Sequence, residues 1–239
     1  MDTDRHDTDR HDRELTARAA AHHALSDVHR LQLVDALQLS DRTPSELATQ
    51  LGLGSNLLAF HLDVLEAAGL VDRARSEGDG RRRYVRLRPE ASMLIAPGRD
   101  PRAGRLRADD VLFVCTANSA RSQLAAALWE RTTGLSARSA GAAPAAAVHP
   151  LARDVAGAHG LDIGARRPQG YDAVGTAPDL VVSVCDRANE APLPFDVPRL
   201  HWSIPDPVGH GRRAVEAAYD ELTIRIAWLA AGRLQEPAA

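Results

Sequence analysis

The residues with the clearest chemical potential are Cys115 and Arg121, which frame a Cys-x5-Arg loop. The apolar run Val111 to Val114 predicts a short buried strand before the cysteine, and Ser122 to Thr132 predicts a helix after the loop. This order wraps backbone N–H groups around one point at the positive end of a helix dipole, which suits a tetrahedral oxyanion. The same field stabilises a thiolate, so Cys115 is a candidate nucleophile.

Side chains within this loop have complementary roles. The planar fork of Arg121 can hold two oxyanion oxygens, which a lysine could not reproduce. Ser122 can donate a hydrogen bond toward the sulfur, and Asn118 can brace the loop. The pattern alone also fits a buried inert cysteine with a surface arginine, but its position between a strand and a helix favours the oxyanion site. The predicted oxyanion-binding residues are Thr116, Ala117, Asn118, Ser119, Ala120 and Ser122.

The elements that must position this loop follow it in the chain. Strand and helix patterns alternate through residues 109–239, which predicts an α/β domain with a parallel sheet. The expected elements are a strand end at Arg138 to Gly141, a helix at Pro150 to Gly160, a strand at Leu180 to Val184 and a long helix at Ala214 to Ala231.

This half of the chain resembles the low-molecular-weight protein tyrosine phosphatase superfamily, and more closely its arsenate reductases. The resemblance covers roughly residues 110 to 229, and its further stretches are Ser139 to Gly141, His149 to Ala152, Gly160 to Ile163, Val181 to Asp186 and Trp202 to Pro207. It implies that Cys115 is the nucleophile, Arg121 the oxyanion clamp and Asp206 the general acid that protonates the leaving oxygen. An Asp-Pro pair in isolation would indicate only a turn.

The residues after Asp206-Pro207 bear on the substrate. In phosphatases of this family tyrosines typically follow that pair and wall the aromatic substrate, whereas Val208-Gly209 follows here. Nothing near this turn in the sequence would stack on a phosphotyrosine ring. The sequence therefore favours a small inorganic oxyanion, arsenate or phosphate, over a phosphotyrosine.

Cys185 is the second of two cysteines in the chain and ends the predicted strand Leu180 to Val184. In a parallel sheet both strand ends face one crevice, so Cys185 could attack an oxidised or arsenylated Cys115. The resemblance likewise implies a resolving cysteine, although a buried strand cysteine is an equal alternative. Thioredoxin-coupled members carry a third cysteine, where this chain has Ala191 and Pro192. We therefore expect no bound cofactor, and an external small thiol or redoxin as reductant.

Residues 15–90 follow the order of a winged helix-turn-helix. A helical apolar stripe comes first, and Thr43-Pro44-Ser45-Glu46 then predicts a capped helix start. Gly52 ends that helix, and Ser55 is the expected cap of the next. Two short strands, Val71 to Arg75 and Arg82 to Leu87, flank the turn-forming Gly78-Asp79-Gly80.

The same region resembles the ArsR-type winged-helix family through Glu46 to Leu53, His61 to Leu65 and Ala68 to Val71. The resemblance implies an operator-binding homodimer, which we expect to form through the helices around residues 15–39. The helix from Ser55 should enter the major groove, and the basic hairpin should contact phosphates, although such a hairpin can be only a solvated face. The candidate DNA-binding residues are Ser55, Asn56, Ala59, His61, Arg73, Arg75, Arg81, Arg82 and Arg83.

No metal site is predicted. Regulators of this family often sense arsenite through cysteines in the winged domain, and this one has none. His22, His23, His29 and His61 are too scattered in sequence to predict a site. Residues 1–14 carry a duplicated, polar Thr-Asp-Arg-His-Asp segment that predicts a disordered tail.

The bulk composition is consistent with two domains joined by a linker. A net charge of -3 excludes a globally basic nucleic-acid binder but allows a local basic face. Residues 91–108 mix Pro, Gly and Arg, which predicts a linker that permits independent or coupled domains. Two cysteines are too few for a disulfide scaffold, and no apolar run approaches the ~18 residues of a membrane span. A cytoplasmic protein without membrane contact is expected.

We therefore predict a bifunctional arsenic-resistance protein, in which a DNA-binding regulator is fused to a thiol-dependent arsenate reductase. One alternative is a transcription factor whose second domain senses an oxyanion without turnover. The other is a low-molecular-weight tyrosine phosphatase.

Overall fold

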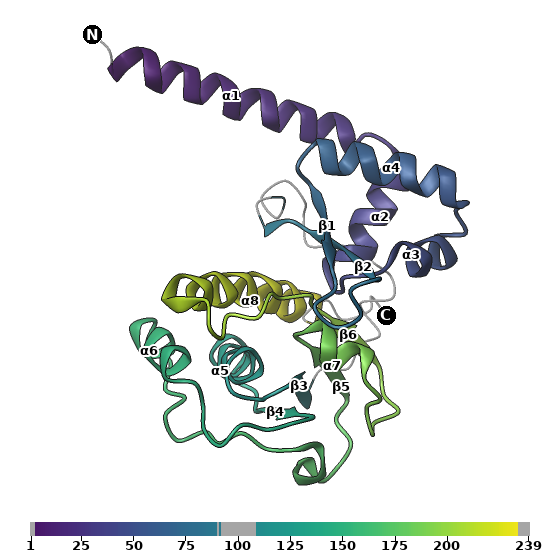
Figure 1. Cartoon of the computed structure of the whole chain (residues 1–239). Coiled ribbons are helices and arrows are strands. Elements are labelled where there is room, and N and C mark those ends of the chain that lie inside the picture. Colours follow the sequence, from purple (N-terminus) through teal and green to yellow (C-terminus); the bar gives the residue numbers. More distant parts are fainter. Residues whose placement is uncertain (1–2, 90, 92–108, 234–239) are drawn as a thin grey trace.

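The computed structural model describes residues 3–89, 91 and 109–233. The N-terminal unit contains four helices followed by an antiparallel hairpin, as Figure 1 shows. Its elements are α1 (Thr3–Ala24), α2 (Val28–Gln38), α3 (Pro44–Leu51), α4 (Ser55–Ala67), β1 (Val71–Arg75) and β2 (Arg83–Leu87). This is the predicted winged helix-turn-helix, with α3 and α4 as the helix pair and the β1–β2 hairpin as the wing.

Local sequence signals set most of these helix ends. Thr43 and Glu46 form a reciprocal capping box at the start of α3, and Gly52 ends α3 in the left-handed region at φ 65°. The predicted cap at Ser55 is wrong, because Gly54 is the N-cap of α4 and provides no side-chain hydrogen bond. Asp27 caps α2 by accepting the backbone N–H groups of its first turn.

The predicted disordered tail is also wrong, since the chain is helical from Thr3. α1 projects from the rest of the molecule as a long rod (Figure 1). Its second half is rich in alanine, the strongest helix former, and within residues 11–24, whose burial is described, Ala21 and Ala24 alone are buried in the core. Helix formation is cooperative, so an anchored Ala-rich segment extends the helix into the polar residues before it.

The C-terminal unit is a four-stranded sheet with helices around it. Its elements are β3 (Val111–Cys115), α5 (Arg121–Thr133), β4 (Ala137–Gly141), α6 (Pro150–Ala158), η3 (Tyr171–Val174), β5 (Leu180–Ser183), α7 (Asp186–Glu190), β6 (Arg199–His201) and α8 (Gly211–Arg233). The strand order is β4-β3-β5-β6 and every pairing is parallel, which confirms the predicted α/β class. The sequence analysis missed η3, α7 and β6, all of which are short.

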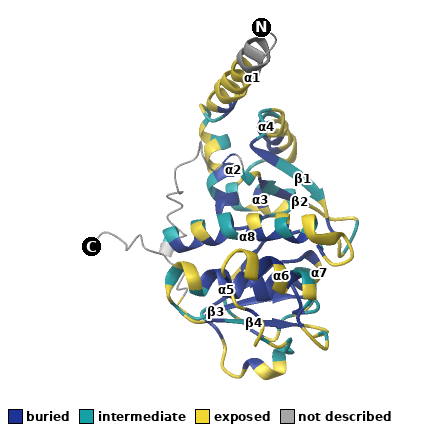
Figure 2. Ribbon diagram, turned by 90° about the vertical axis from the view of Figure 1, so that its left-hand side faces the viewer, coloured by how far each residue is buried: buried dark blue, intermediate teal, exposed yellow. Residues whose placement is uncertain are grey.

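The two units pack against each other through β6, α7, α8 and the wing. Figure 2 shows α8 between the N-terminal unit and the sheet. Trp228 of α8 packs on the core of the winged unit, and the Trp202 indole donates to the Leu39 carbonyl. Apart from Ala91, the predicted linker lies outside the described residues. Among the helices described, none combines the length and apolar character needed to cross a membrane.

Candidate functional site

The Cys-x5-Arg loop connects the end of β3 to the start of α5. Cys115 is buried, and its Sγ accepts the backbone N–H of Asn118 at 3.2 Å. The hydroxyl oxygen of Ser122 lies 3.0 Å from the same sulfur and accepts the Asn118 amide at 2.8 Å. Because that oxygen already accepts from Asn118, its own hydrogen is available to the sulfur. Two donors, the Asn118 N–H and the Ser122 hydroxyl, therefore converge on the Cys115 Sγ.

The loop backbone is oriented by the segment that follows β4. Ala143 and Ala145 donate their N–H groups to the carbonyls of Thr116 and Ala117, both at 2.9 Å, and His149 donates to Ser119 at 2.8 Å. These bonds hold the loop carbonyls outward. Since the C=O and N–H of one peptide point in opposite directions, the Ala117–Asn118 peptide turns its N–H inward to the sulfur. This inward N–H lies in the loop that the sequence predicts to bind an oxyanion.

Two residues make this tight loop possible. Asn118 has a φ of 47°, in the left-handed region that asparagine tolerates better than most residues. Its side-chain oxygen accepts from the backbone of Gln169 and from the Gln123 amide. Gly141, at the end of β4, lies so close that a Cβ there would be 2.5 Å from the Thr116 carbonyl oxygen. A side chain at this position would displace the loop.

Arg121 is buried at 6% exposure, and its guanidinium contacts three residues outside the loop. One Nη donates to the Ile204 carbonyl at 2.8 Å, and the other lies 3.1 Å from an Asp206 carboxylate oxygen. The predicted clamp and the predicted general acid are therefore direct neighbours. The third contact is an ion pair with Glu77 of the wing, whose carboxylate lies 3.7 Å from Arg121.

Glu77 is held by the C-terminal unit at three points. Both of its carboxylate oxygens accept the Asp206 backbone N–H, at 3.0 and 3.1 Å. Its own N–H donates to Asp186 at 2.8 Å, and its carbonyl accepts from Arg187. No feature of the sequence indicates this contact, because an acidic residue beside a Gly-Asp-Gly turn predicts a solvated tip.

Cys185 follows β5 as the N-cap of α7, with its Sγ accepting from the Ala188 N–H. β5 pairs directly with β3, so Cys185 and Cys115 leave the same edge of the sheet. Thr116 of the loop lies 3.6 Å from the Cys185 sulfur. Burial raises the pKa of the Cys185 thiol, and the negative charge of Cys115 raises it further. Both cysteines are free thiols.

Two residues near this edge of the sheet, Tyr171 and Asp186, were not predicted from the sequence as part of the site. Burial raises the pKa of Tyr171 to about 12, with the charges of the two cysteines adding to the effect. Burial alone would raise the pKa of Asp186, but hydrogen bonds from His201, the Glu77 N–H and Ser203 hold it below its usual range. Asp186 therefore remains a carboxylate that joins β6 to the wing.

On the winged unit, the exposed start of α4 carries three of the predicted DNA contacts, Ser55, Asn56 and Ala59. The prediction for His61 is wrong, because this side chain is buried at 4% exposure on the opposite face of α4. Its position in the sequence fits the buried stripe with Leu58, Leu62 and Leu65.

The wing arginines differ in their freedom to reach DNA. Arg73 pairs with Asp63 and Glu66 of α4, and Arg75 donates to the Gly80 carbonyl. Arg81 and Arg82 both lie near Asp79, yet the Arg81 side chain is 91% exposed. Arg83 is exposed at the start of β2.

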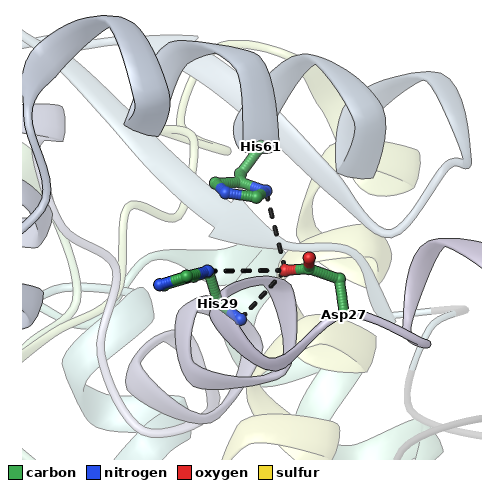
Figure 3. A group of neighbouring side chains, drawn as sticks. All are labelled: Asp27, His29 and His61. Atoms are coloured by element: carbon green, nitrogen blue, oxygen red, sulfur yellow. Dashed lines mark hydrogen bonds and ion pairs between the residues drawn. The ribbon is translucent and has the colours of Figure 1, made fainter.

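The fold also brings together residues that were too far apart in sequence to suggest a site. Asp27, His29 and His61 offer ligand atoms within 4.8 Å of one another, and Figure 3 shows both imidazoles directed at the same carboxylate oxygen. His61 comes from α4, whereas Asp27 and His29 belong to the start of α2.

Comparison with known proteins assigns both units. Residues 110–237 match the low molecular weight phosphotyrosine protein phosphatase family, and residues 25–74 match a helix-turn-helix domain family. An arsenate reductase of Bacillus cereus (strain AH187) is 34% identical over 121 residues, which are 48% of this chain and 90% of the relative. Arsenate reductase 2 of Staphylococcus haemolyticus is 32% identical over 120 residues, 48% of this chain and 92% of the relative.

A solved arsenate reductase from Archaeoglobus fulgidus is 31% identical, covers 51% of this chain and 98% of its own, and superposes with a TM-score of 0.47. The matched family spans more than half of the chain. The chain therefore belongs to the low molecular weight phosphotyrosine protein phosphatase family, with a helix-turn-helix domain fused before it.

Proposed function

We propose that this protein is a thiol-dependent arsenate reductase fused to a DNA-binding transcriptional regulator. The observation that carries the proposal is the pair of free thiols, Cys115 in the predicted oxyanion loop and Cys185 on the neighbouring parallel strand. A phosphatase needs only the first thiol, whereas a reductase needs a second to accept the oxidising equivalents. The similarity to named arsenate reductases supports the same choice.

In the first step, arsenate binds in the loop with its oxygens on the inward N–H groups and Arg121. The Cys115 thiolate attacks As(V), and Asp206 supplies a proton to the oxygen that leaves as water. The product is an arsenate bound to the Cys115 sulfur. Asp206 suits this role because its carboxylate is next to the Arg121 guanidinium that holds the oxyanion.

In the second step, the Cys185 thiolate attacks the Cys115 sulfur. The sulfur–arsenic bond breaks and its electron pair remains on arsenic, which leaves as arsenite, As(III). Two thiols are thereby oxidised to one Cys115–Cys185 disulfide while arsenic gains two electrons. An external small thiol or redoxin then reduces the disulfide, because the sequence contains no third cysteine.

The winged unit supplies the regulatory half of the proposal. The start of α4 is exposed for major-groove contact, and the wing adds exposed arginines such as Arg81 for the phosphate backbone. A homodimer through α1 and α2 is part of this proposal, because two copies would read two half-sites of an operator.

Turnover is tested with purified protein, arsenate and a panel of thiols and redoxins, with released arsenite as the readout. Wild-type protein should release arsenite and Cys115→Ser should release none. Arg121→Lys keeps the charge but loses the planar fork, so it should lower kcat/KM by at least roughly tenfold. Faster hydrolysis of p-nitrophenyl phosphate than arsenate reduction would favour a phosphatase instead.

One observation favours a second candidate, an oxyanion sensor without turnover. The wing, which should contact DNA, is in direct contact with the oxyanion clamp through Glu77 and Arg121. A sensor would show an arsenate-dependent change in DNA affinity but no arsenite release with any thiol.

A further inference from the structure

The tip of the wing contacts two residues of the predicted oxyanion site, Arg121 and Asp206. Its Glu77 carboxylate lies beside Arg121 and accepts the Asp206 N–H, so two groups of the oxyanion site already hold a carboxylate. The Arg121 Nη that faces Glu77 also donates to the Ile204 carbonyl, and the other Nη lies beside the Asp206 carboxylate. An oxyanion that needs the Arg121 fork must therefore displace one of these partners.

Glu77 is the partner best suited to leave. Ile204 and Asp206 belong to the same unit as Arg121. Glu77 comes from the hairpin of the other unit, and its side chain is 41% exposed. A second negative charge placed beside this carboxylate in a partly buried site would repel it. Oxyanion binding and Glu77 docking are thus mutually unfavourable.

The rest of the tip is attached to the C-terminal unit through α7 (Asp186–Glu190). Ser76 and the Asp79 N–H both donate to Glu190 of α7, and a Cβ at Gly78 would lie 2.2 Å from the Glu190 carboxylate oxygen. Gly78 therefore permits the tip to lie directly on α7. Movement of Glu77 would disturb this whole contact, because its own N–H is bound to Asp186 at the start of α7.

We propose that Glu77 is an internal carboxylate ligand of the oxyanion site, and that an inorganic oxyanion displaces it and frees the tip of the DNA-binding wing. The inference rests on the proposed binding of an oxyanion in this loop and adds the route by which binding reaches the wing. It does not require turnover. Binding at the two sites is reciprocal: if an oxyanion changes the affinity for DNA by some factor, DNA changes the affinity for the oxyanion by the same factor.

The test uses inorganic phosphate as the probe, measured by calorimetry on the full chain without any thiol. Glu77→Gln should bind phosphate roughly tenfold more tightly than wild type, within the usual range of coupling between sites. Glu66→Gln is the matched control, because it removes one charge from the winged unit at an exposed position whose ion pair is with Arg73. This control should bind phosphate as wild type does.

Hydrogen exchange gives the second readout. Saturating phosphate should accelerate exchange at the amides of Glu77 and Asp79, which donate to Asp186 and Glu190 in the docked wing. Equal or weaker phosphate binding in Glu77→Gln, or unchanged exchange at these amides in phosphate-saturated wild type, would overturn the proposal. Absence of arsenite release would leave both measurements interpretable, because neither involves electron transfer.

An independent observation concerns the cluster in Figure 3. His61 is buried, and neither of its ring nitrogens has a hydrogen-bond partner. Its Nδ1 lies 3.7 Å from an Asp27 carboxylate oxygen, and the His29 Nδ1 lies 3.9 Å from the same atom. A buried polar group without a hydrogen-bond partner is energetically unfavourable. Some ligand for the imidazole is therefore expected.

We infer that Asp27, His29 and His61 form a binding site for a divalent transition-metal cation such as Zn²⁺. Two imidazoles and one carboxylate are borderline ligands that suit this ion, and tetrahedral coordination requires ligand atoms roughly 3.4 Å apart. Small rotations of Asp27 and His29, which are both partly exposed, would bring the three atoms to that spacing. The bound ion would join α2 to α4, the helix proposed to enter the major groove.

Co²⁺ serves as the probe, because its visible absorption reports tetrahedral coordination. The parent chain carries His6→Gln and His11→Gln, so that the N-terminal repeats contribute no imidazole. We expect one Co²⁺ per chain, with binding lost in His61→Gln and retained in His23→Gln, a control at an exposed position of α1. Asp27→Asn should weaken binding while preserving the α2 cap, since asparagine caps equally well. Identical Co²⁺ binding by the parent, His61→Gln and Asp27→Asn would overturn the inference.

Discussion

Asp41 and Arg225 form an ion pair at 2.9 Å that is almost completely buried between the two units of the chain. Asp41 follows α2 in the winged unit, and Arg225 belongs to α8. The second carboxylate oxygen of Asp41 accepts the Ser203 N–H, and Arg225 is also held by Glu221. The pair therefore fixes the winged unit to the loop that leads to Asp206.

Removal of one partner of this pair should strongly destabilise the protein. Arg225→Met leaves the Asp41 carboxylate buried without its counter-charge, at an expected cost of about 3–5 kcal/mol in the free energy of unfolding. The measurement is urea denaturation followed by far-UV circular dichroism. The double variant Asp41→Leu/Arg225→Met also removes the fully buried carboxylate and leaves only the more exposed Glu221 without its partner, so it should recover part of the loss. A cost below about 1 kcal/mol for Arg225→Met would contradict the buried pair.

Gly141→Ala tests the backbone contact that shapes the oxyanion loop. The added Cβ would lie 2.5 Å from the Thr116 carbonyl oxygen, so the loop must move. We expect a loss of about 1–3 kcal/mol in stability, as for overpacked sites, together with loss of phosphate binding. Gly157→Ala in α6 is the control, because nothing lies within 4 Å of its Cβ position and alanine favours the helix. Wild-type phosphate binding by Gly141→Ala would refute the packing argument.

The wing arginines should contribute unequally to DNA binding. Arg81 has a 91% exposed side chain, whereas Arg73 is already paired with two carboxylates of α4. Arg81→Ala should lower the slope of log affinity against log salt by about 0.9, the value for one lost phosphate contact. Arg73→Ala should leave that slope nearly unchanged. Fluorescence anisotropy with any duplex DNA measures this, and equal effects of the two variants would contradict the assignment.

The step assigned to Cys185 should depend on pH in a particular direction. Burial raises the pKa of its thiol above the ordinary 9.0, so the rate of disulfide formation with Cys115 should continue to rise beyond pH 9.0. Rapid-quench mass spectrometry of a single turnover gives this rate. The folding stability should change with pH in the opposite direction to this rate. As pH rises through 9.0, the unfolded chain releases this proton before the folded protein does, so folding stability falls. A rate that levels off well below pH 9.0 would contradict the assignment.

Locally encoded features could be predicted from the sequence, whereas contacts between the units could not. The capping box of Thr43 and Glu46 and the loop from Cys115 to Arg121 depend on neighbours a few residues apart. Glu77 is an acidic residue in a glycine-rich turn, and only the packing of two units places it beside Arg121. His61 was assigned to DNA although its helical spacing with Leu58, Leu62 and Leu65 already indicated burial. The helical structure of α1 likewise depends on the anchored Ala-rich half of the helix, which the polar residues before it do not reveal.

In the proposed function, Cys115 and Cys185 together reduce arsenate. The most direct test of this claim is one turnover of the reduced protein with arsenate and no external thiol, followed by peptide mass spectrometry and arsenite determination. We predict one arsenite released per chain and a disulfide between Cys115 and Cys185, with neither formed in Cys115→Ser. Both cysteines recovered as free thiols, with no arsenite released, would contradict the claim.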